Sequence, residues 1–387
     1  MAITGLEVHH AATVEAPSGF EAGVAVDAEG RQWLVQVPTT TVTAVALETE
    51  ITLLRELAPL VEQGTLPFTV PQPAGFSPLL GGGRAVVFPR IVGSALVLAK
   101  LYPGPGAAAS LGRAIAAIHE LPRYIVEDSG LPSYSADDYR RRHLAMLDEA
   151  AQSGRIPRVL LRRWEAALEN VSLWRFTPVV CHASLSEESV IMAHGQVSAI
   201  VDWAGAQIAD PADDLAWLVA GAPADTVDSI LEAYQLGRTE LLDPHLLDRA
   251  HLLSELALVR WLSHGVRTAD EQVISEAVAM MNDLLGETTE TGTFNISHLK
   301  TAPPSQPAVL VSDQDSADPS AELVVTTDAA FEVPAGAQFE VPAGAQFEVP
   351  AGTKVPNYDR ATPPGPHADD QTSTFAVLDP DEAQATD

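Results

Sequence analysis

Apolar and polar residues alternate through GVAVDAEGRQWLVQVP, which runs from Gly23 to Pro38 around an Ala-Glu-Gly turn. Alternation with a period of two, interrupted by turn residues, is typical of a β-hairpin. A third extended stretch, GGGRAVVFPRIVG at 81–93, begins with a glycine turn and continues through apolar residues. Residues 43–64 instead carry apolar side chains at helical spacing, which predicts a helix that ends before Gly64. The N-terminal part is therefore predicted to hold strands and one helix.

After about Ala95 the pattern changes to long amphipathic segments, which predict helices. These segments are residues 109–122, 137–154, 158–174, 225–237 and 245–266. A short β-rich block at 177–218 lies between the third and the fourth. We therefore expect an α+β two-lobed layout, with a β-rich N-lobe over 1–94, a mainly helical C-lobe over 95–286, and the chemistry in a cleft between them.

Charge narrows the classes of partner. The chain has 52 acidic and 22 basic residues, a formal net charge of −30. Nucleic acid and anionic membrane surfaces would repel such a chain, so we expect neither as a partner. Its lone cysteine, Cys181, excludes an intramolecular disulfide. No apolar run approaches the roughly 20 residues that span a bilayer, and the N-terminus lacks the pattern of a signal peptide, so we expect a cytoplasmic protein.

Residues 287–387 differ in composition from the rest. They hold 17 acidic and 3 basic residues, 12 of the 29 prolines and none of the six tryptophans. Such a segment has little apolar surface to offset the entropy of ordering, so we predict a disordered acidic tail. Within it, FEVPAGAQ repeats with a period of eight over 331–352. The repeats are either a neutral spacer or a multivalent motif that a protein partner reads.

The block that begins at His182 has the spacing of a phosphoryl-transfer site. Kinase-type enzymes need a base two residues after a histidine, an asparagine five residues further on, and a downstream aspartate that binds magnesium. Here Ser184 and Ser189 stand at the first two of these places. Asp202, followed by a tryptophan, stands at the third. The order and spacing match, but two residue types do not.

The sequence resembles the aminoglycoside and macrolide phosphotransferase family, from about residue 15 to 285. The most specific stretch is IVDWAGAQIADPADDLAWL at 200–218, and LGRAIAAIHELP at 111–122 is similar to that family's helix before Leu-Pro. The resemblance implies a kinase-like fold with ATP and Mg²⁺ as cofactors and a small-molecule acceptor.

The family's site residues carry over in part. Asp202 matches the magnesium-binding aspartate, and Glu50 matches the helix glutamate that pairs with a strand lysine. Ser184 replaces the catalytic aspartate, Ser189 replaces the metal-binding asparagine, and Gln36 replaces the lysine. The three replacements remove the base, a metal ligand and the cation on the phosphates.

Several other polar residues have structural explanations. Asp210 before Pro211 is a good helix cap. Asp214 is expected to stabilise the fold, His182 to hold its loop by hydrogen bonds, and Cys181 to lie in a buried strand. His119 is expected to finish its helix.

Three hypotheses for function follow. The first is a degenerate phosphotransferase, a pseudokinase that acts by binding nucleotide or a partner. The second is an active ATP-dependent kinase of a hydroxylated metabolite or antibiotic, whose missing parts are supplied by other side chains. Arg31 or Arg84 would then reach the phosphates, and Glu187 or Glu188 would act as the base. The third is an interaction protein that works through its tail, with no cofactor.

Overall fold

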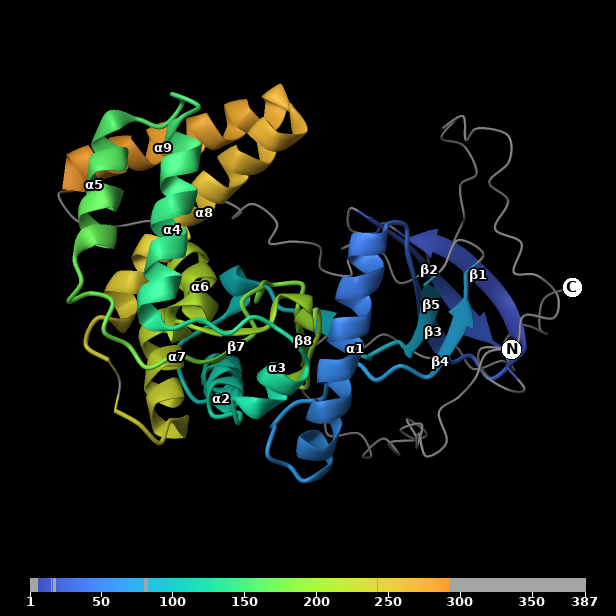
Figure 1. The fold of residues 1–387 in the computed structure, drawn as a ribbon. Helices are drawn as coiled ribbons and strands as arrows, with labels where there is room; N and C mark the ends of the chain where they lie inside the picture. Colours follow the sequence, from blue (N-terminus) through green and yellow to red (C-terminus); the bar gives the residue numbers. More distant parts are fainter. Residues whose placement is uncertain (1–5, 15, 17–18, 80–82, 242, 292–387) are drawn as a thin grey trace, which may run out of the picture. The chain divides into compact units, whose positions relative to one another are not determined.

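We describe a computed structural model of the chain, which describes residues 6–14, 16, 19–79, 83–241 and 243–291. The N-lobe is a five-stranded antiparallel sheet with the strand order β1-β2-β3-β5-β4 (Figure 1). Its strands are β1 Val8–Val14, β2 Phe20–Asp27, β3 Gln32–Pro38, β4 Gly75–Pro78 and β5 Arg84–Pro89. The predicted hairpin is β2 and β3, in which Val24 lies opposite Leu34.

Helix α1, Thr41–Glu62, packs on one face of this sheet (Figure 1). A capping box begins it: the Thr40 hydroxyl accepts a hydrogen bond from the Thr43 amide at 3.1 Å, and the Thr43 hydroxyl accepts one from the Thr40 amide at 3.2 Å. Its buried stripe includes Leu47 and Leu54, which join the main hydrophobic core. The periodicity of the sequence predicted this helix, and the structure confirms it.

The C-lobe is mainly helical (Figure 1). Its helices are α2 Ala107–His119, α3 Tyr124–Asp128, α4 Ala136–Ala151, α5 Arg158–Glu169, α6 Ala216–Gly221, α7 Ala224–Gly237, α8 Leu246–Thr268 and α9 Glu271–Thr291. Three short 3₁₀ turns accompany them: η1 Leu98–Lys100, η2 Trp203–Gly205 and η3 Pro211–Leu215. The largest helix contact is α2 against α7. Gly112 of α2 lies so close to α7 that an added Cβ would be 2.2 Å from the Ile230 carbonyl oxygen.

The predicted β-rich block forms two small sheets that carry the candidate chemistry. In one, β7 Val179–Cys181 pairs antiparallel with β10 Gln207–Ala209. In the other, the hairpin of β8 Val190–Ala193 and β9 Gln196–Ile200 pairs with β6 Ser94–Ala95. This arrangement leaves residues 182–189 as the connection between the two sheets.

The predicted α+β, kinase-like fold class is confirmed, and the differences lie at element ends. Helix α5 ends at Glu169, five residues before the predicted end at Trp174. Helix α9 was not predicted, and it runs to Thr291, so residues 287–291 are helical. The rest of the predicted tail, with the repeats at 331–352, lies outside the described residues. Among the helices of the described chain, none is long and apolar enough to cross a membrane.

Candidate functional site

Asp214 holds the loop after β7 through two hydrogen bonds. One carboxylate oxygen of Asp214 accepts a hydrogen bond from the His182 amide at 2.8 Å, and the other accepts one from the Ala183 amide at 2.7 Å. Burial alone would raise the pKa of Asp214, but the hydrogen bond from His119 and that from the His182 amide help to lower it, so the group is ionised at neutral pH. Ala183 has a φ of 59°, in the left-handed region. This conformation is costly for alanine and persists only where surrounding contacts fix the backbone. The expected structural role of Asp214 is confirmed.

The His182 side chain ties the loop to the end of β9. Its Nε2 lies 2.9 Å from the Val201 carbonyl oxygen, which can only accept, so Nε2 carries the proton. Burial lowers the pKa of His182, which keeps the ring neutral. The ring packs edge-on against Trp203 at 4.7 Å between centroids. His182 therefore holds its loop by hydrogen bonding, as the sequence predicted.

Ser184 occupies the place where a base was expected. Its hydroxyl lies 3.0 Å from the Asp202 carbonyl oxygen and 3.2 Å from Nδ1 of His182. A serine hydroxyl has one proton, so it donates to only one of these acceptors at a time. The structure thus brings Ser184 next to Asp202 as the spacing implied, but with a side chain that is no base at neutral pH.

Ser189, at the predicted second metal position, turns into its own loop. Its side chain is buried, and its hydroxyl accepts a hydrogen bond from the Ser186 amide at 2.8 Å and donates to the Ser186 carbonyl at 3.2 Å. In return the Ser186 hydroxyl accepts from the Ser189 amide at 3.3 Å. Both hydrogen-bonding functions of the Ser189 hydroxyl are therefore used within the turn.

Asp202 follows β9 and precedes η2. Its φ of 66° places it in the left-handed region, which is uncommon for a residue other than glycine and is frequent at functional sites. Burial, with a contribution from the charge of Glu50, raises the pKa of Asp202 to about 8. Its carboxylate has no hydrogen bond or ion pair within the described part of the chain.

Glu50 reaches this point from α1. Its carboxylate accepts a hydrogen bond from the Trp203 amide at 2.9 Å. Burial raises the pKa of Glu50 to about 7, and that hydrogen bond partly offsets the effect. The site therefore holds two carboxyl groups that are each more easily protonated than in water, with no described cation paired to either.

Gln36 is at the strand position where a cation was expected. Its residue is 8% exposed. It lies on the same face of β3 as Leu34, and that face packs into the main core with α1. Its side chain has no hydrogen bond to the residues that the structure describes, and it is neutral. Gln36 is thus on the α1 side of the sheet, and because its side chain is neutral it cannot form the ion pair with Glu50 that a lysine would form.

Three of the four substitutes weighed from the sequence are engaged elsewhere. Arg84 binds Glu48 with two hydrogen bonds of 2.6 and 2.5 Å, and Arg31 binds Asp27 at 2.7 Å. Glu187 accepts a hydrogen bond from the Leu98 amide. Glu188 is exposed.

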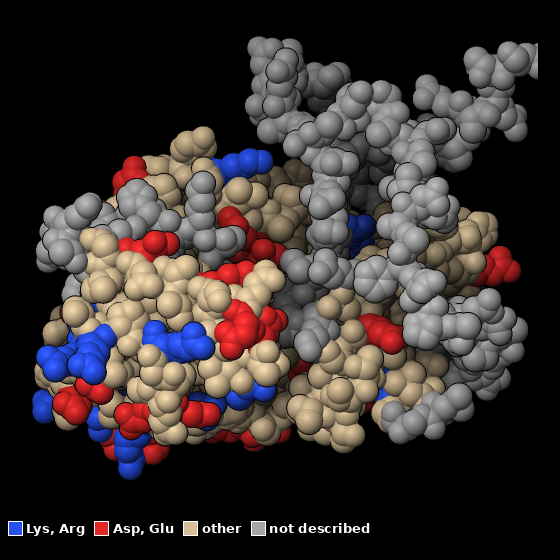
Figure 2. All heavy atoms as spheres, turned by 90° about the horizontal axis from the view of Figure 1, so that it is seen from above, with Lys and Arg blue, Asp and Glu red and all other residues tan. Residues whose placement is uncertain are grey.

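Much of the positive charge of the C-lobe lies outside the candidate site. Residues 140–175 hold eight arginines and four acidic residues. Among them, Arg140 pairs with Asp137 at 2.8 Å, and Arg141 pairs with Asp138 at 2.9 Å. Figure 2 shows several basic side chains gathered toward one side of the drawn face, with acidic side chains spread over much of the rest. This region contains no strand or loop of the candidate site.

Asp210 is the predicted helix cap and also a buried ion-pair partner. It accepts a hydrogen bond from the Ala212 amide at 2.9 Å, which confirms the cap. Its two oxygens also bind Arg249 of α8 at 2.5 and 3.0 Å, a pairing that the sequence reasoning missed. An arginine within the apolar periodicity of RAHLLSEL was the available signal.

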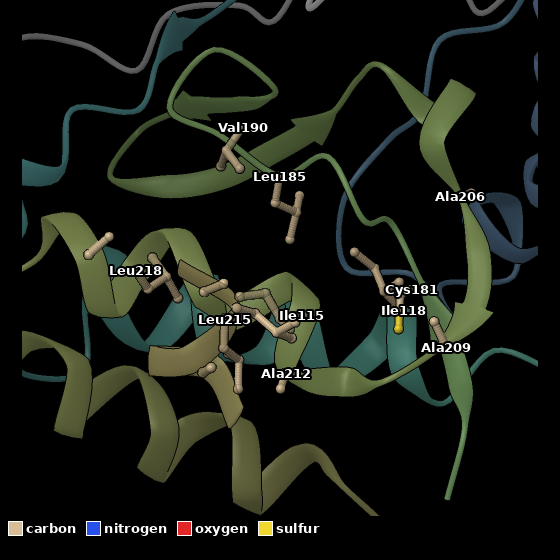
Figure 3. Packing of buried hydrophobic residues seen from close by; sticks show 14 of the residues in the cluster. Ile115, Ile118, Cys181, Leu185, Val190, Ala206, Ala209, Ala212, Leu215 and Leu218 are labelled. Carbon is tan, nitrogen blue, oxygen red and sulfur yellow. The ribbon is translucent and has the colours of Figure 1, made fainter. Parts of the chain in front are cut away.

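His119, Cys181 and Asp214 bring their side-chain ligand atoms within 4.8 Å of one another, but each is already engaged. His119 bonds Asp214 at 3.1 Å and the Tyr234 hydroxyl at 2.8 Å, so it does more than finish its helix. Cys181 is fully buried in the main hydrophobic cluster, part of which Figure 3 shows. The prediction of a buried strand cysteine is confirmed, and the cluster is a structural network.

The comparisons with known proteins agree with the fold described above. Residues 13–253 match the model of the phosphotransferase enzyme family. Among solved structures, macrolide 2′-phosphotransferase MphH from Brachybacterium faecium is 23% identical with a TM-score of 0.61, over 72% of this chain and 94% of that one.

Two further solved structures are similar. A type I macrolide 2′-phosphotransferase is 22% identical with a TM-score of 0.61, over 72% of this chain and 92% of that one. The GDP and kanamycin complex of APH(2″)-IIIa is 19% identical with a TM-score of 0.60, over 72% and 94%. None of the curated proteins matches this sequence.

Proposed function

The chain belongs to the phosphotransferase enzyme family, and from this membership we propose that it is a degenerate member that acts by binding nucleotide or a partner rather than by efficient phosphoryl transfer. The observation that carries the proposal is Ser184, whose hydroxyl hydrogen-bonds to the loop at the place of the catalytic base. A positioned general base typically contributes about 10² to 10⁴ in rate. Its loss would leave a slow enzyme or none.

A deficit of positive charge supports the same proposal. Phosphoryl transfer depends on cations that neutralise the transferred group. Gln36 is neutral, and Arg84 and Arg31 are paired to acids of their own. Lys100, the lone lysine of residues 1–286, is exposed at the end of η1.

The family's metal ligands fit only in part. Asp202 offers a carboxylate without a protein partner in the described chain, which suits Mg²⁺. Ser189 does not fit, because its hydroxyl already donates and accepts within its own turn. When bound, the ion would neutralise phosphate charge; Asp202 would hold it, and Asp214 and His182 would hold the loop around it.

The proposed nucleotide ligand is ATP. The proposed acceptor-site ligand is a small hydroxylated molecule. Similar structures contain GDP and kanamycin by their own descriptions. A cytoplasmic location, which would supply the nucleotide, is part of the proposal.

Calorimetric titration of ATP and ADP into the full chain, with and without Mg²⁺, tests the binding half. We expect binding in the wild type that Asp202→Ala weakens. A parallel assay follows phosphate transfer to macrolides, aminoglycosides and sugars. Transfer at rates usual for kinases, abolished by Asp202→Ala, would overturn the proposal in favour of an active phosphotransferase.

A further inference from the structure

Helix α5 carries two arginines whose charge is not paired within the described chain. Arg158 and Arg162 are exposed, and neither makes an ion pair or a hydrogen bond to the residues that the structure describes. They stand four positions apart on one face of the helix, so their like charges repel each other. Arg158 is also the first residue of α5, where the helix dipole disfavours a cation. The pair is therefore locally unfavourable, and an anion from elsewhere would offset this.

Several arginines nearby are instead neutralised by acidic neighbours. In α4, Arg140 and Arg141 each pair with an aspartate three residues earlier, at 2.8 and 2.9 Å. In α5, Arg163 pairs with Glu255 of α8. The first turn of α5 holds no acidic residue that could do the same for the exposed pair. This contrast indicates that the exposed pair serves binding rather than the stability of its own helix.

The same face of α5 is also partly apolar. Val159 lies beside the two arginines and is 62% exposed. A helix turns by about 100° per residue, so Arg158, Val159 and Arg162 share one face. The α5 face, defined by these three residues, therefore offers two cations next to an apolar side chain. A ligand that fits it combines carboxylates with apolar groups.

The C-terminal part of this chain contains a segment of that composition. Residues 301–353 hold eight acidic residues and no lysine or arginine. Three of the acids belong to the repeats, where each FEVPAG unit places a glutamate between a phenylalanine and a valine. These glutamates are Glu332, Glu340 and Glu348. The chain therefore carries three copies of a motif that matches the α5 face in charge and polarity.

The repeats are also within reach of the α5 face. Helix α9, after which the chain continues toward the repeats, contacts α5 (Figure 1). Residues 292–330 join its end at Thr291 to the first repeat. A flexible chain of that length has an end-to-end distance of about 35 Å, whereas α5 is about 18 Å long. Tethering at this range gives a high effective concentration, which is needed because single exposed ion pairs are weak.

We propose that the FEVPAG repeats, which begin at Phe331, Phe339 and Phe347, dock on the α5 face of their own chain. A repeat glutamate binds Arg158 and Arg162, and the apolar side chains of the same unit contact Val159. The three units are equivalent, so they compete for one face and two stay free. The inference does not depend on the proposed function, because α5 contributes no residue to the candidate site.

Distances between two nitroxide labels in the full chain, measured by double electron–electron resonance, test the docking. One label is attached through Ala166→Cys, at an exposed position of α5, and the other through Ala337→Cys in the first repeat. Cys181 is fully buried, so the native chain should take up no label. We expect a population of distances below about 30 Å, whereas an undocked chain would spread broadly around about 40 Å.

Reversing the charge of the α5 face tests the arginines. Arg158→Glu with Arg162→Glu should reduce the short-distance population at least about 3-fold, as high salt should in the parent protein. Arg113→Glu with Arg267→Glu is the matched control, because it changes the net charge equally at exposed arginines of α2 and α8. The control should keep the population, and urea unfolding checks that each variant is folded.

Removing the repeat glutamates tests the ligand. The triple variant Glu332→Gln, Glu340→Gln and Glu348→Gln should also reduce the population at least about 3-fold. Its control removes three charges outside the repeats and should have a smaller effect; the substitutions are Asp313→Asn, Asp315→Asn and Asp318→Asn. An equal loss in both triple variants would show that the repeats are not the docked element.

Two further results would overturn the inference. One is the absence of distances below about 30 Å in the parent protein, or their equal loss in both arginine variants. The other is a short distance between molecules in a mixture of singly labelled chains, because a second copy would then occupy the α5 face. Failure of ATP to bind, with the expected distances observed, would count against the proposed function alone.

Discussion

Glu50 of α1 accepts a hydrogen bond of 2.9 Å from the amide of Trp203, the residue after Asp202. The contact joins helix α1 of the N-lobe directly to the segment that carries Asp202. Glu50 therefore binds the backbone amide directly after Asp202, and Gln36, at the β3 position where a cation was expected from the sequence, is neutral.

The stability of the protein should fall as pH rises. The pKa of Glu50 is raised to about 7 and that of Asp202 to about 8 in the folded chain, above the values near 4 expected on unfolding. Over that window the folded state holds protons that the unfolded state releases, so the free energy of unfolding decreases as pH increases. Urea unfolding in a chelator should show a loss of several kcal/mol between about pH 5 and pH 9, at about 1.4 kcal/mol for each pKa unit.

A double variant tests whether Glu50 and Asp202 cause this loss of stability. In Glu50→Gln with Asp202→Asn the dependence on pH should be flatter, so the double variant gains stability relative to the wild type above about pH 8. An equal slope in both proteins would show that other groups cause it.

Restoring the family residues should create or increase phosphoryl transfer. The triple variant Ser184→Asp, Ser189→Asn and Gln36→Lys returns a base, a metal ligand and a cation. We expect transfer from ATP to rise at least about 10²-fold, the lower range for a general base. Mass spectrometry of an aminoglycoside and macrolide panel measures the product.

The same triple variant with Asp202→Ala is the control, and it should lose the gain. A wild type that already transfers phosphate as fast as the triple variant would contradict the prediction, because Ser184 would then be no obstacle.

Asp214 should be essential for the loop that carries Ser184. Its two oxygens accept the amides of His182 and Ala183 at 2.8 and 2.7 Å, and His119 binds it as well. Asp214→Asn replaces one oxygen by a donor and leaves a buried amide unpaired, which should lower the free energy of unfolding by about 2–4 kcal/mol. Chemical unfolding measures this.

Asp148, exposed on α4, offers the comparison. Asp148→Asn should change the free energy of unfolding by less than about 0.5 kcal/mol. If both substitutions have equally small effects, the loop does not depend on Asp214.

The sequence predicted what depends on local pattern. Periodicity identified α1 and the β2–β3 hairpin, and spacing placed Ser184 beside Asp202. Strand β1 escaped because six of its seven residues are exposed, so no alternation marks it. Helix α9 did carry a signal, with Ile274, Ala277, Met281 and Leu284 buried at helical spacing, and it went unrecognised.

Partners distant in sequence could not be predicted. Nothing in the pattern around Glu50 indicates that its acceptor oxygen meets the amide of Trp203. Residue type alone also did not reveal that Ser189 turns inward to Ser186, since a serine at a metal position is compatible with either direction. Contacts of this kind depend on the packing of whole elements, which a periodic pattern does not encode.

The closeness of α2 and α7 leads to a last prediction. A Cβ on Gly112 would lie 2.2 Å from the Ile230 carbonyl oxygen and 2.9 Å from the Tyr234 nitrogen. Both are backbone atoms of α7, so neither can turn away as a side chain could, and the two helices must separate. Because α7 also carries Tyr234, which binds His119 next to Asp214, separation would disturb the support of the loop at 182–189. Gly112→Ala should lower the free energy of unfolding by about 2–3 kcal/mol or more, although alanine is the better helix former.

Gly286 of α9 provides the same substitution without the contact. It is exposed, and a Cβ there meets no described atom within 4 Å. Gly286→Ala should therefore raise the free energy of unfolding by up to about 1 kcal/mol through helix propensity alone. Urea unfolding of both variants decides between the explanations. Opposite signs would establish the α2–α7 approach as the cause, whereas a stabilised Gly112→Ala would mean that these helices are not packed backbone to backbone.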